Sequence, residues 1–185
     1  MPANTPVPTR AASTPQTGQP SVPLVAPLPS GRFEGRNAFQ QLLRDALATA
    51  AQEGWREMVW ADASFADWPL GERSVDASLR AWSQTGRKLT LLAKDYSVVQ
   101  ARHHRFVQWR RDWSHIVEAR ACPSADALEL PSALYSPHWV LQRLDPVHCN
   151  GVTEAQPQRR VALREQLAEW LGKSSFSFPA VTLGL

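Results

Sequence analysis

The 185-residue sequence contains little cysteine and no long apolar run. Its two cysteines, Cys122 and Cys149, form no CxxC pair, so the sequence predicts neither a disulfide framework nor a zinc ribbon. Apolar stretches such as residues 89–93 are far shorter than the roughly 20 residues that a membrane-spanning helix requires. We therefore expect two reduced thiols and no membrane span.

Signals for export and for common cofactors are also missing. Prolines interrupt the apolar residues 22–28, and no basic segment precedes them, so a cytoplasmic location is the expectation. The sequence contains no Walker A loop, no GxGxxG turn and no GxSxG elbow. His103 and His104 are adjacent on an expected helix and point about 100° apart, which prevents joint chelation. No cofactor and no metal site is predicted.

Proline is concentrated at the N-terminus. Eight of the fifteen prolines lie in residues 1–30, where Arg10 is the only charged side chain. A segment of this composition buries too little apolar surface to offset the entropy lost on ordering. The sequence therefore predicts a disordered proline-rich tail over residues 1–31 and one domain over residues 32–185, which is long enough to form a core.

Apolar periodicity predicts alternating helices and strands in that domain. Helices are expected over residues 37–53, 74–85, 98–113 and 163–171, and strands over 58–61, 88–93, 116–120 and 138–144. Residues 123–137 have the composition of a loop, residues 148–153 that of a hairpin partner, and residues 176–185 that of an extended edge segment. This order predicts an α/β fold with a mixed, mostly parallel sheet and helices on both faces.

One window of the fourth expected strand carries a family motif in altered form. The window runs from His138 to Asp145, and Asn150-Gly151 follows it. It resembles the HxKxxxxD signature of the phospholipase D superfamily, with Val140 in place of the lysine. Over most of residues 37–175 the chain is similar to degenerate, single-unit bacterial members of that superfamily, whose function is unknown. The resemblance implies a phospholipase D-like half-domain.

The replacement of the motif lysine by Val140 affects the catalytic chemistry that the resemblance implies. In the family one histidine attacks phosphorus, another protonates the leaving oxygen, and the lysine neutralises the phosphate. Val140 cannot supply that charge, which is worth several kcal/mol in comparable sites. The leading hypothesis is therefore a noncatalytic binding or scaffolding module, not an enzyme, in which His138 and Asp145 are vestigial.

Two alternatives stay open. A homodimer could join His138 from two subunits in a phosphodiesterase or nuclease, with Arg143 or Arg105 replacing the lysine, although Arg143 has the opposite strand parity. The chain could instead bind nucleic acid weakly through the helix of residues 102–111, with Arg102, His104 and Arg105 as the binding residues for an anionic ligand.

The composition and the helical spacing limit the nucleic-acid hypothesis. The net charge of +3 and the pI near 9.2 are mild for a dedicated nucleic-acid binder. The spacing of Trp109 and Trp113 predicts core positions rather than stacking platforms for bases. The same helix, with Arg110 and Arg111, is also compatible with a solvated basic face.

Overall fold

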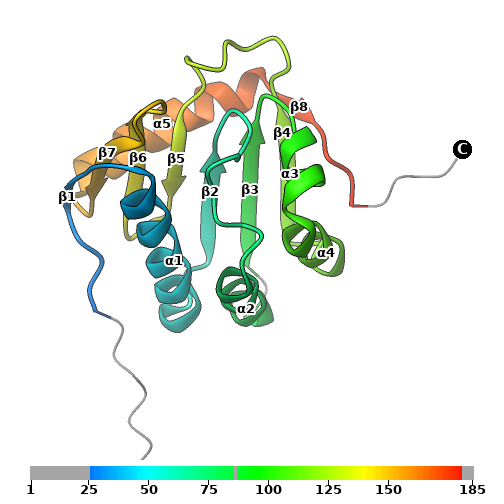
Figure 1. Ribbon diagram of the computed structural model, residues 1–185, viewed down its shortest axis with the longest axis horizontal. Coiled ribbons are helices and arrows are strands. Elements are labelled where there is room, and N and C mark those ends of the chain that lie inside the picture. Colours follow the sequence, from blue (N-terminus) through cyan, green and yellow to red (C-terminus); the bar gives the residue numbers. More distant parts are fainter. Residues whose placement is uncertain (1–25, 86, 181–185) are drawn as a thin grey trace, which may run out of the picture.

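The fold is one eight-stranded mixed sheet with helices on its two faces (Figure 1). The computed structural model describes residues 26–85 and 87–180, so most of the expected tail and residues 181–185 lie outside the described part. The strands are β1 (Gly31–Phe33), β2 (Glu57–Ala61), β3 (Lys88–Ala93), β4 (Val117–Ala121), β5 (Ser132–Tyr135), β6 (Val140–Asp145), β7 (Asn150–Glu154) and β8 (Ser175–Phe176). The helices are α1 (Arg36–Glu53), α2 (Arg73–Trp82), α3 (Ser97–Arg102), α4 (His104–Asp112) and α5 (Pro157–Lys173), with a short 3₁₀ turn over Ser83–Thr85.

Strands β2, β3 and β4 form the parallel centre of the sheet. Trp60 of β2 aligns with Leu91 of β3, which aligns with Ala119 of β4. Helix α2 connects β2 to β3, and helices α3 and α4 connect β3 to β4. Strands β2 and β3 are buried on both faces, and such burial requires the nearly continuous apolar runs that the sequence shows here.

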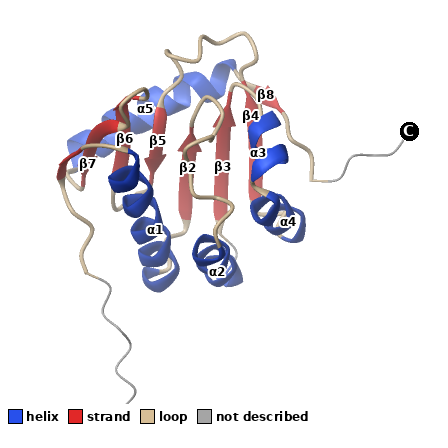
Figure 2. Cartoon of the chain, viewed as in Figure 1, coloured by secondary structure: helices blue, strands red, loops and turns tan. Residues whose placement is uncertain are grey.

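Helices α1 to α4 cover one face of the sheet, and α5 covers the other (Figure 2). Trp60, Trp68 and Phe106 belong to the core on the first face, with exposed fractions of 2% or less. Val59 and Val140 pack with Leu163 and Leu167 of α5 on the second face. The predicted α/β class with helices on both faces is confirmed.

The prediction of a mostly parallel sheet is wrong. Only the β2–β3 and β3–β4 pairings are parallel, and the other five are antiparallel. The error arises at β5, which lies within the expected loop of residues 123–137 and pairs with both β2 and β6. Four residues connect β5 to β6 and four connect β6 to β7, too few for the crossover that parallel strands need.

The expected third helix is two helices. The chain leaves helical geometry at His103, with φ −111° and ψ 53°, between α3 and α4. The buried ring of His103 lies with Nε2 3.0 Å from the carbonyl oxygen of Phe65. Burial lowers the pKa of His103, which favours the neutral ring at this contact. The contact between His103 and Phe65 therefore lies at the break between α3 and α4. Helical spacing alone predicted one continuous helix here.

The folded body begins within the segment that the sequence assigned to the tail. Gly31 pairs with Thr153 in the β1–β7 ladder. The carbonyl oxygen of Pro29 accepts hydrogen bonds from Trp139 Nε1 at 2.9 Å and from Thr153 Oγ1 at 2.8 Å. At the other end, the expected edge segment is present as the two-residue strand β8, which pairs with β4.

We predict that Gly151→Ala destabilises the domain. A Cβ atom at Gly151 would lie 2.2 Å from the carbonyl oxygen of Gln142 and 2.6 Å from Cζ of Phe33. Overpacking of this kind costs about 1–3 kcal/mol, to be measured by urea unfolding. Gly172→Ala is the control because its Cβ would meet nothing within 4 Å. In helix α5 it should stabilise by about 0.5–1 kcal/mol. Equal stability of the two variants would contradict the packing described here.

Candidate functional site

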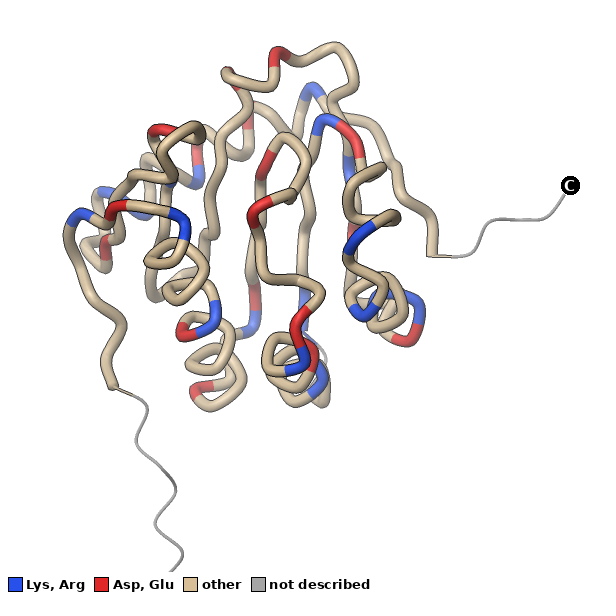
Figure 3. The backbone as a smooth tube through the Cα atoms, in the orientation of Figure 1, with Lys and Arg blue, Asp and Glu red and all other residues tan. Residues whose placement is uncertain are grey.

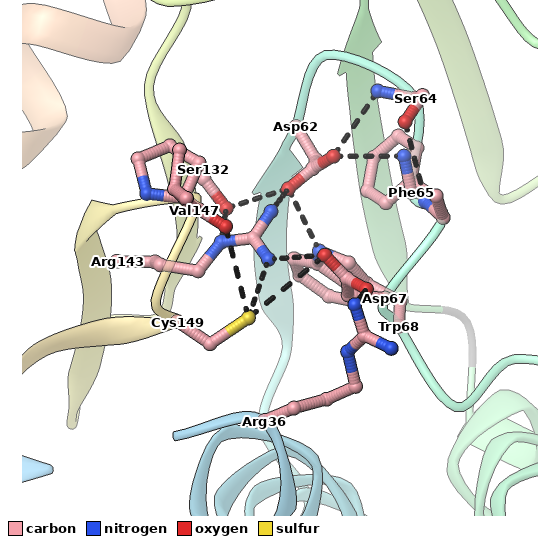
Figure 4. Close-up of polar contacts among 12 residues, drawn as sticks. Arg36, Asp62, Ser64, Phe65, Asp67, Trp68, Ser132, Arg143, Val147 and Cys149 are labelled. Carbon is pink, nitrogen blue, oxygen red and sulfur yellow. Dashed lines mark hydrogen bonds and ion pairs between the residues drawn. The ribbon is translucent and has the colours of Figure 1, made fainter. Parts of the chain in front are cut away.

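The most extensive polar cluster surrounds the guanidinium of Arg143 (Figure 4). Arg143 Nη2 donates to Asp62 Oδ2 at 2.7 Å, Nη1 donates to Asp67 Oδ2 at 2.8 Å, and Nε donates to Ser132 Oγ at 3.0 Å. Cys149 Sγ lies 3.4 Å from Nη1. We call these five residues the Arg143 cluster. They come from β5, β6 and the segments after β2 and β6, so the cluster joins the parallel and antiparallel parts of the sheet.

Asp62 is fully engaged in this cluster. Its Oδ1 accepts from the backbone N–H groups of Ser64 and Phe65, and its Oδ2 accepts from Ser132 Oγ and Trp68 Nε1 as well as from Arg143. The Asp62 side chain is 3% exposed and that of Arg143 is 5% exposed. These contacts hold the turn after β2 in place and leave the carboxylate no free acceptor direction.

The charges of the cluster compensate one another. Burial acts to lower the pKa of Arg143, but the carboxylates of Asp62 and Asp67 outweigh it, and the pKa is raised. The guanidinium also lies over the ring of Phe39 of α1, with 4.7 Å from Cζ to the ring centroid. A buried ion pair that is satisfied on both sides has a structural role, because no group is left to bind a ligand.

The vestigial motif residues do not form a site. His138 precedes β6 instead of lying in it, and its exposed ring stacks on Trp55 at 5.7 Å on the side of α1. Val140 points to the opposite face and packs in the core beneath α5. The expected strand over residues 138–144 would put His138 and Val140 on one face. That expectation is wrong, because the strand begins only at Val140.

Asp145 stabilises the turn between β6 and β7. Its carboxylate accepts from the backbone N–H groups of Val147 and His148 and contacts His148 Nδ1 at 2.7 Å, which caps the turn between β6 and β7. These hydrogen bonds with His148 lower the pKa of Asp145. His138 and Asp145 lie near opposite ends of β6, roughly 20 Å apart by strand rise.

The two arginines proposed to replace the lysine are engaged elsewhere. Arg143 belongs to the cluster with Asp62, and Arg105 donates to the carbonyl oxygen of Gly71 at 2.7 Å. Neither has a described contact with His138. Within one subunit, neither of these two arginines takes the place of the missing lysine beside His138.

The predicted binding residues Arg102, His104 and Arg105 are all exposed, along α3 and α4. Of the three, His104 lines a pocket of about 450 Å³ between these helices and the C-terminal segment. Figure 3 shows the run of basic positions on α3 and α4. The structure therefore places the three residues on one surface but does not bring them together in one site.

Arg110 is the unexpected member of this pocket. It is 6% exposed, although the sequence suggested a solvated basic residue. Its Nε and Nη1 are buried and have no hydrogen-bond partner among residues 26–85 and 87–180. The guanidinium lies 5.2 Å from the ring centroid of Phe178, and burial lowers the pKa of Arg110. We call the space that it lines the Arg110 pocket. The described residues that line it are Gln100, His104, Val107, Gln108, Arg110, Arg111, Phe178, Pro179 and Ala180.

A sequence signal for Arg110 was present. Phe106, Trp109 and Trp113 define the inner stripe of α4, and Arg110 lies four residues after the first and three before the last. Helical spacing therefore places it on the apolar side. Strand parity gave the equivalent signal for Arg143, which shares a face of β6 with buried Leu141.

The described residues contain no group of three or more His, Cys, Asp or Glu side chains that could hold a metal ion. In the same part of the chain, no helix is long and apolar enough to cross a membrane. Cys122 and Cys149 are both free and buried.

No family model matches the chain, and no curated protein matches it. Among solved structures, the fold is similar to that of TrmBL2, an archaeal chromatin protein described as showing a novel mode of DNA binding. The TM-score is 0.60 and the sequence identity is 14%. The likeness covers 86% of this chain and 57% of TrmBL2, so this chain spans little more than half of that protein's length. At this identity the likeness shows a shared fold.

We predict that Arg143→Met strongly destabilises the domain. The substitution leaves Asp62 buried without its cation, and breaking a buried pair costs about 3–5 kcal/mol in the free energy of unfolding. Arg143→Lys keeps the charge but loses the planar fork, and should fall between Met and wild type. Lys173→Met removes an exposed partner of Glu169 and should leave the unfolding midpoint almost unchanged. Chemical denaturation of all three variants measures the order, and a midpoint for Arg143→Met near that of Lys173→Met would refute the assignment.

Proposed function

We propose that this chain is a noncatalytic module that binds nucleic acid through the exposed face of α3 and α4. The carrying observation is the distribution of charge on these helices. Between Arg102 and Arg111 the chain has four arginines and no acidic residue, and Arg102, Arg105 and Arg111 are exposed. Phosphate oxygens bind such side chains without base specificity.

The structural comparison supports this proposal at the level of the fold. A DNA-binding chromatin protein of similar fold covers most of the present chain. A fold alone does not assign a function, so the argument rests on the surface of this chain. The exposed arginines lie on α3 and α4, on the face of the sheet opposite α5.

The noncatalytic part of the proposal draws on the motif region. We propose that the body is a phospholipase D-like half-unit that has lost its chemistry. Val140 faces the α5 core, His138 stacks on Trp55, and Asp145 caps a turn, so the three positions serve packing and loop geometry. This arrangement supports a binding or scaffolding role and disfavours a phosphodiesterase that joins His138 from two subunits.

The nucleic-acid proposal is tested with the double variant Arg102→Gln/Arg105→Gln. Anisotropy titrations use a labelled 20-base-pair duplex and a single strand of the same length over a range of salt concentrations. Each lost phosphate contact should reduce the slope of log K against log salt by about 1, so the double variant should lose about 2.

The matched control is Arg159→Gln/Arg164→Gln on α5, which changes the net charge equally on the opposite face of the sheet. It should retain the wild-type slope to within experimental error. Equal losses in both double variants would assign the binding to net charge alone, and absent binding of either nucleic acid would remove the proposal.

The noncatalytic proposal has a separate test. Purified full-length protein is incubated with bis(p-nitrophenyl) phosphate, and release of p-nitrophenol is followed by absorbance. We expect the rate of the buffer blank, because no lysine supports a phosphate at His138. Turnover that disappears in His138→Ala would contradict this expectation, while Lys94→Ala serves as a control for nonspecific loss.

A further inference from the structure

We infer that the Arg110 pocket binds a small organic anion, whose carboxylate or phosphate group pairs with the buried guanidinium of Arg110. The inference concerns a different ligand from the nucleic acid proposed above and rests on different contacts. Exposed arginines carry that proposal, whereas a buried arginine without a counter-charge carries this one.

The first step is the contrast between the two buried arginines. Arg143 is 5% exposed and contacts two carboxylates, a hydroxyl and a thiol. Arg110 is 6% exposed overall and has no ion pair or hydrogen bond among the described residues. Burying a charge is costly unless a partner compensates it. Among the described residues, the fold therefore provides a complete set of partners for Arg143 and no counter-charge for Arg110, so the guanidinium of Arg110 is available to a bound anion.

The second step is the construction of the wall behind Arg110. Phe178 lies beneath its guanidinium at 5.2 Å and stacks on Tyr96 with ring centroids 4.8 Å apart. The Tyr96 hydroxyl donates to the carbonyl oxygen of Arg120 at 2.9 Å. Strand β8 fixes the start of this C-terminal segment to β4. These contacts hold Arg110 in place from the protein side, so the guanidinium is preorganised before a ligand arrives.

The third step is the chemistry of the pocket surface. Gln100, His104 and Gln108 offer polar groups beside Arg110, while Val107, Phe178 and Pro179 offer apolar surface. Exposed Arg111 adds a second cation at the rim. None of the described residues that line the pocket carries a carboxylate. Two arginines, amides and an apolar wall suit an acidic group attached to an organic body.

The fourth step is size. The pocket has a volume of about 450 Å³, which lies within the range of small-molecule sites and exceeds the need of a single inorganic ion. An aromatic acid combines an acidic group suited to Arg110 with a ring suited to the apolar surface of Val107 and Pro179. Phenyl phosphate and benzoate are therefore suitable probes, and inorganic phosphate tests the contribution of the charge alone.

The experiment uses the full chain at constant ionic strength set with chloride. Calorimetric titration with phenyl phosphate, benzoate and inorganic phosphate measures affinity for wild type, Arg110→Met and Arg110→Lys. We expect phenyl phosphate or benzoate to bind wild type more tightly than inorganic phosphate does. Arg110→Met should weaken that binding at least 10-fold, and Arg110→Lys should fall between the two because it lacks the planar fork.

A second readout separates ligand binding from a purely structural role. Without ligand, Arg110→Met removes an uncompensated buried charge and should unfold at the same temperature as wild type or higher. A phenyl phosphate-dependent rise in melting temperature should occur in wild type and disappear in Arg110→Met. Arg164→Met on α5 is the control for charge and should behave as wild type in both measurements.

Three outcomes would overturn the inference. A lower melting temperature of ligand-free Arg110→Met, without any anion-dependent shift in wild type, would make Arg110 a structural partner of Phe178. Equal anion effects in wild type and Arg110→Met would indicate nonspecific anion binding. Displacement of bound phenyl phosphate by duplex DNA would identify the anion as a backbone phosphate, whereas independent binding of the two supports a small-molecule site. Failure of the Arg102 and Arg105 variants to change DNA binding would leave these outcomes unaffected.

Discussion

The buried pair of Arg143 and Asp62 fixes the place where the two halves of the sheet meet. Strands β2 to β4 are parallel and β5 to β7 antiparallel, and the pair lies where β2 borders β5. Desolvation consumes most of the Coulomb energy of such a pair, so its net contribution to stability is smaller than its contacts suggest. The pair instead favours this strand order, because an arrangement without β5 and β6 on this side of β2 would leave each charge buried without its partner.

The same cluster explains why the elements around it fit together. Asp62 orders the turn that carries Phe65 and Trp68 into the core, and Arg143 lies over Phe39 of α1. Helix, turn and sheet are therefore tied to one guanidinium. The aromatic core lies next to this cluster, where Trp68 contacts the rings of Phe39, Trp60 and Phe65.

Local patterns in the sequence predicted the elements whose signals are local. The apolar stripe of α1 and the buried runs of β2 and β3 were correct because a period or a continuous run suffices to define them. Strand β5 was missed because four residues after a proline carry no period, and only pairing with β2 and β6 makes them a strand. The resulting error in sheet order also hid the contact of Arg143 with Asp62, which lies 81 residues away.

The candidate sites show a related limit. The spacing between His138 and Asp145 is that of a known motif, yet the strand begins after His138 and turns Val140 to the other face. Linear spacing does not record where a strand starts. The positions of two arginines within apolar patterns were signals outside the motif. Strand parity puts Arg143 on the face of Leu141, and helical spacing puts Arg110 on the apolar side of α4, where a solvated residue was expected. No sequence pattern could identify the residues that contact Arg143 and Arg110, because those contacts depend on the tertiary arrangement.

The outermost strands have a further consequence for behaviour at high concentration. Within the described residues, the sheet ends in β1 with three residues and β8 with two. Exposed strand edges recruit other chains, and short edges limit how many intermolecular backbone hydrogen bonds a neighbour can form. The Arg120 side chain, held over exposed Phe176, adds a charge at one of these ends. The architecture thus resists edge-to-edge aggregation and gives two copies little scope to join by continuing the sheet.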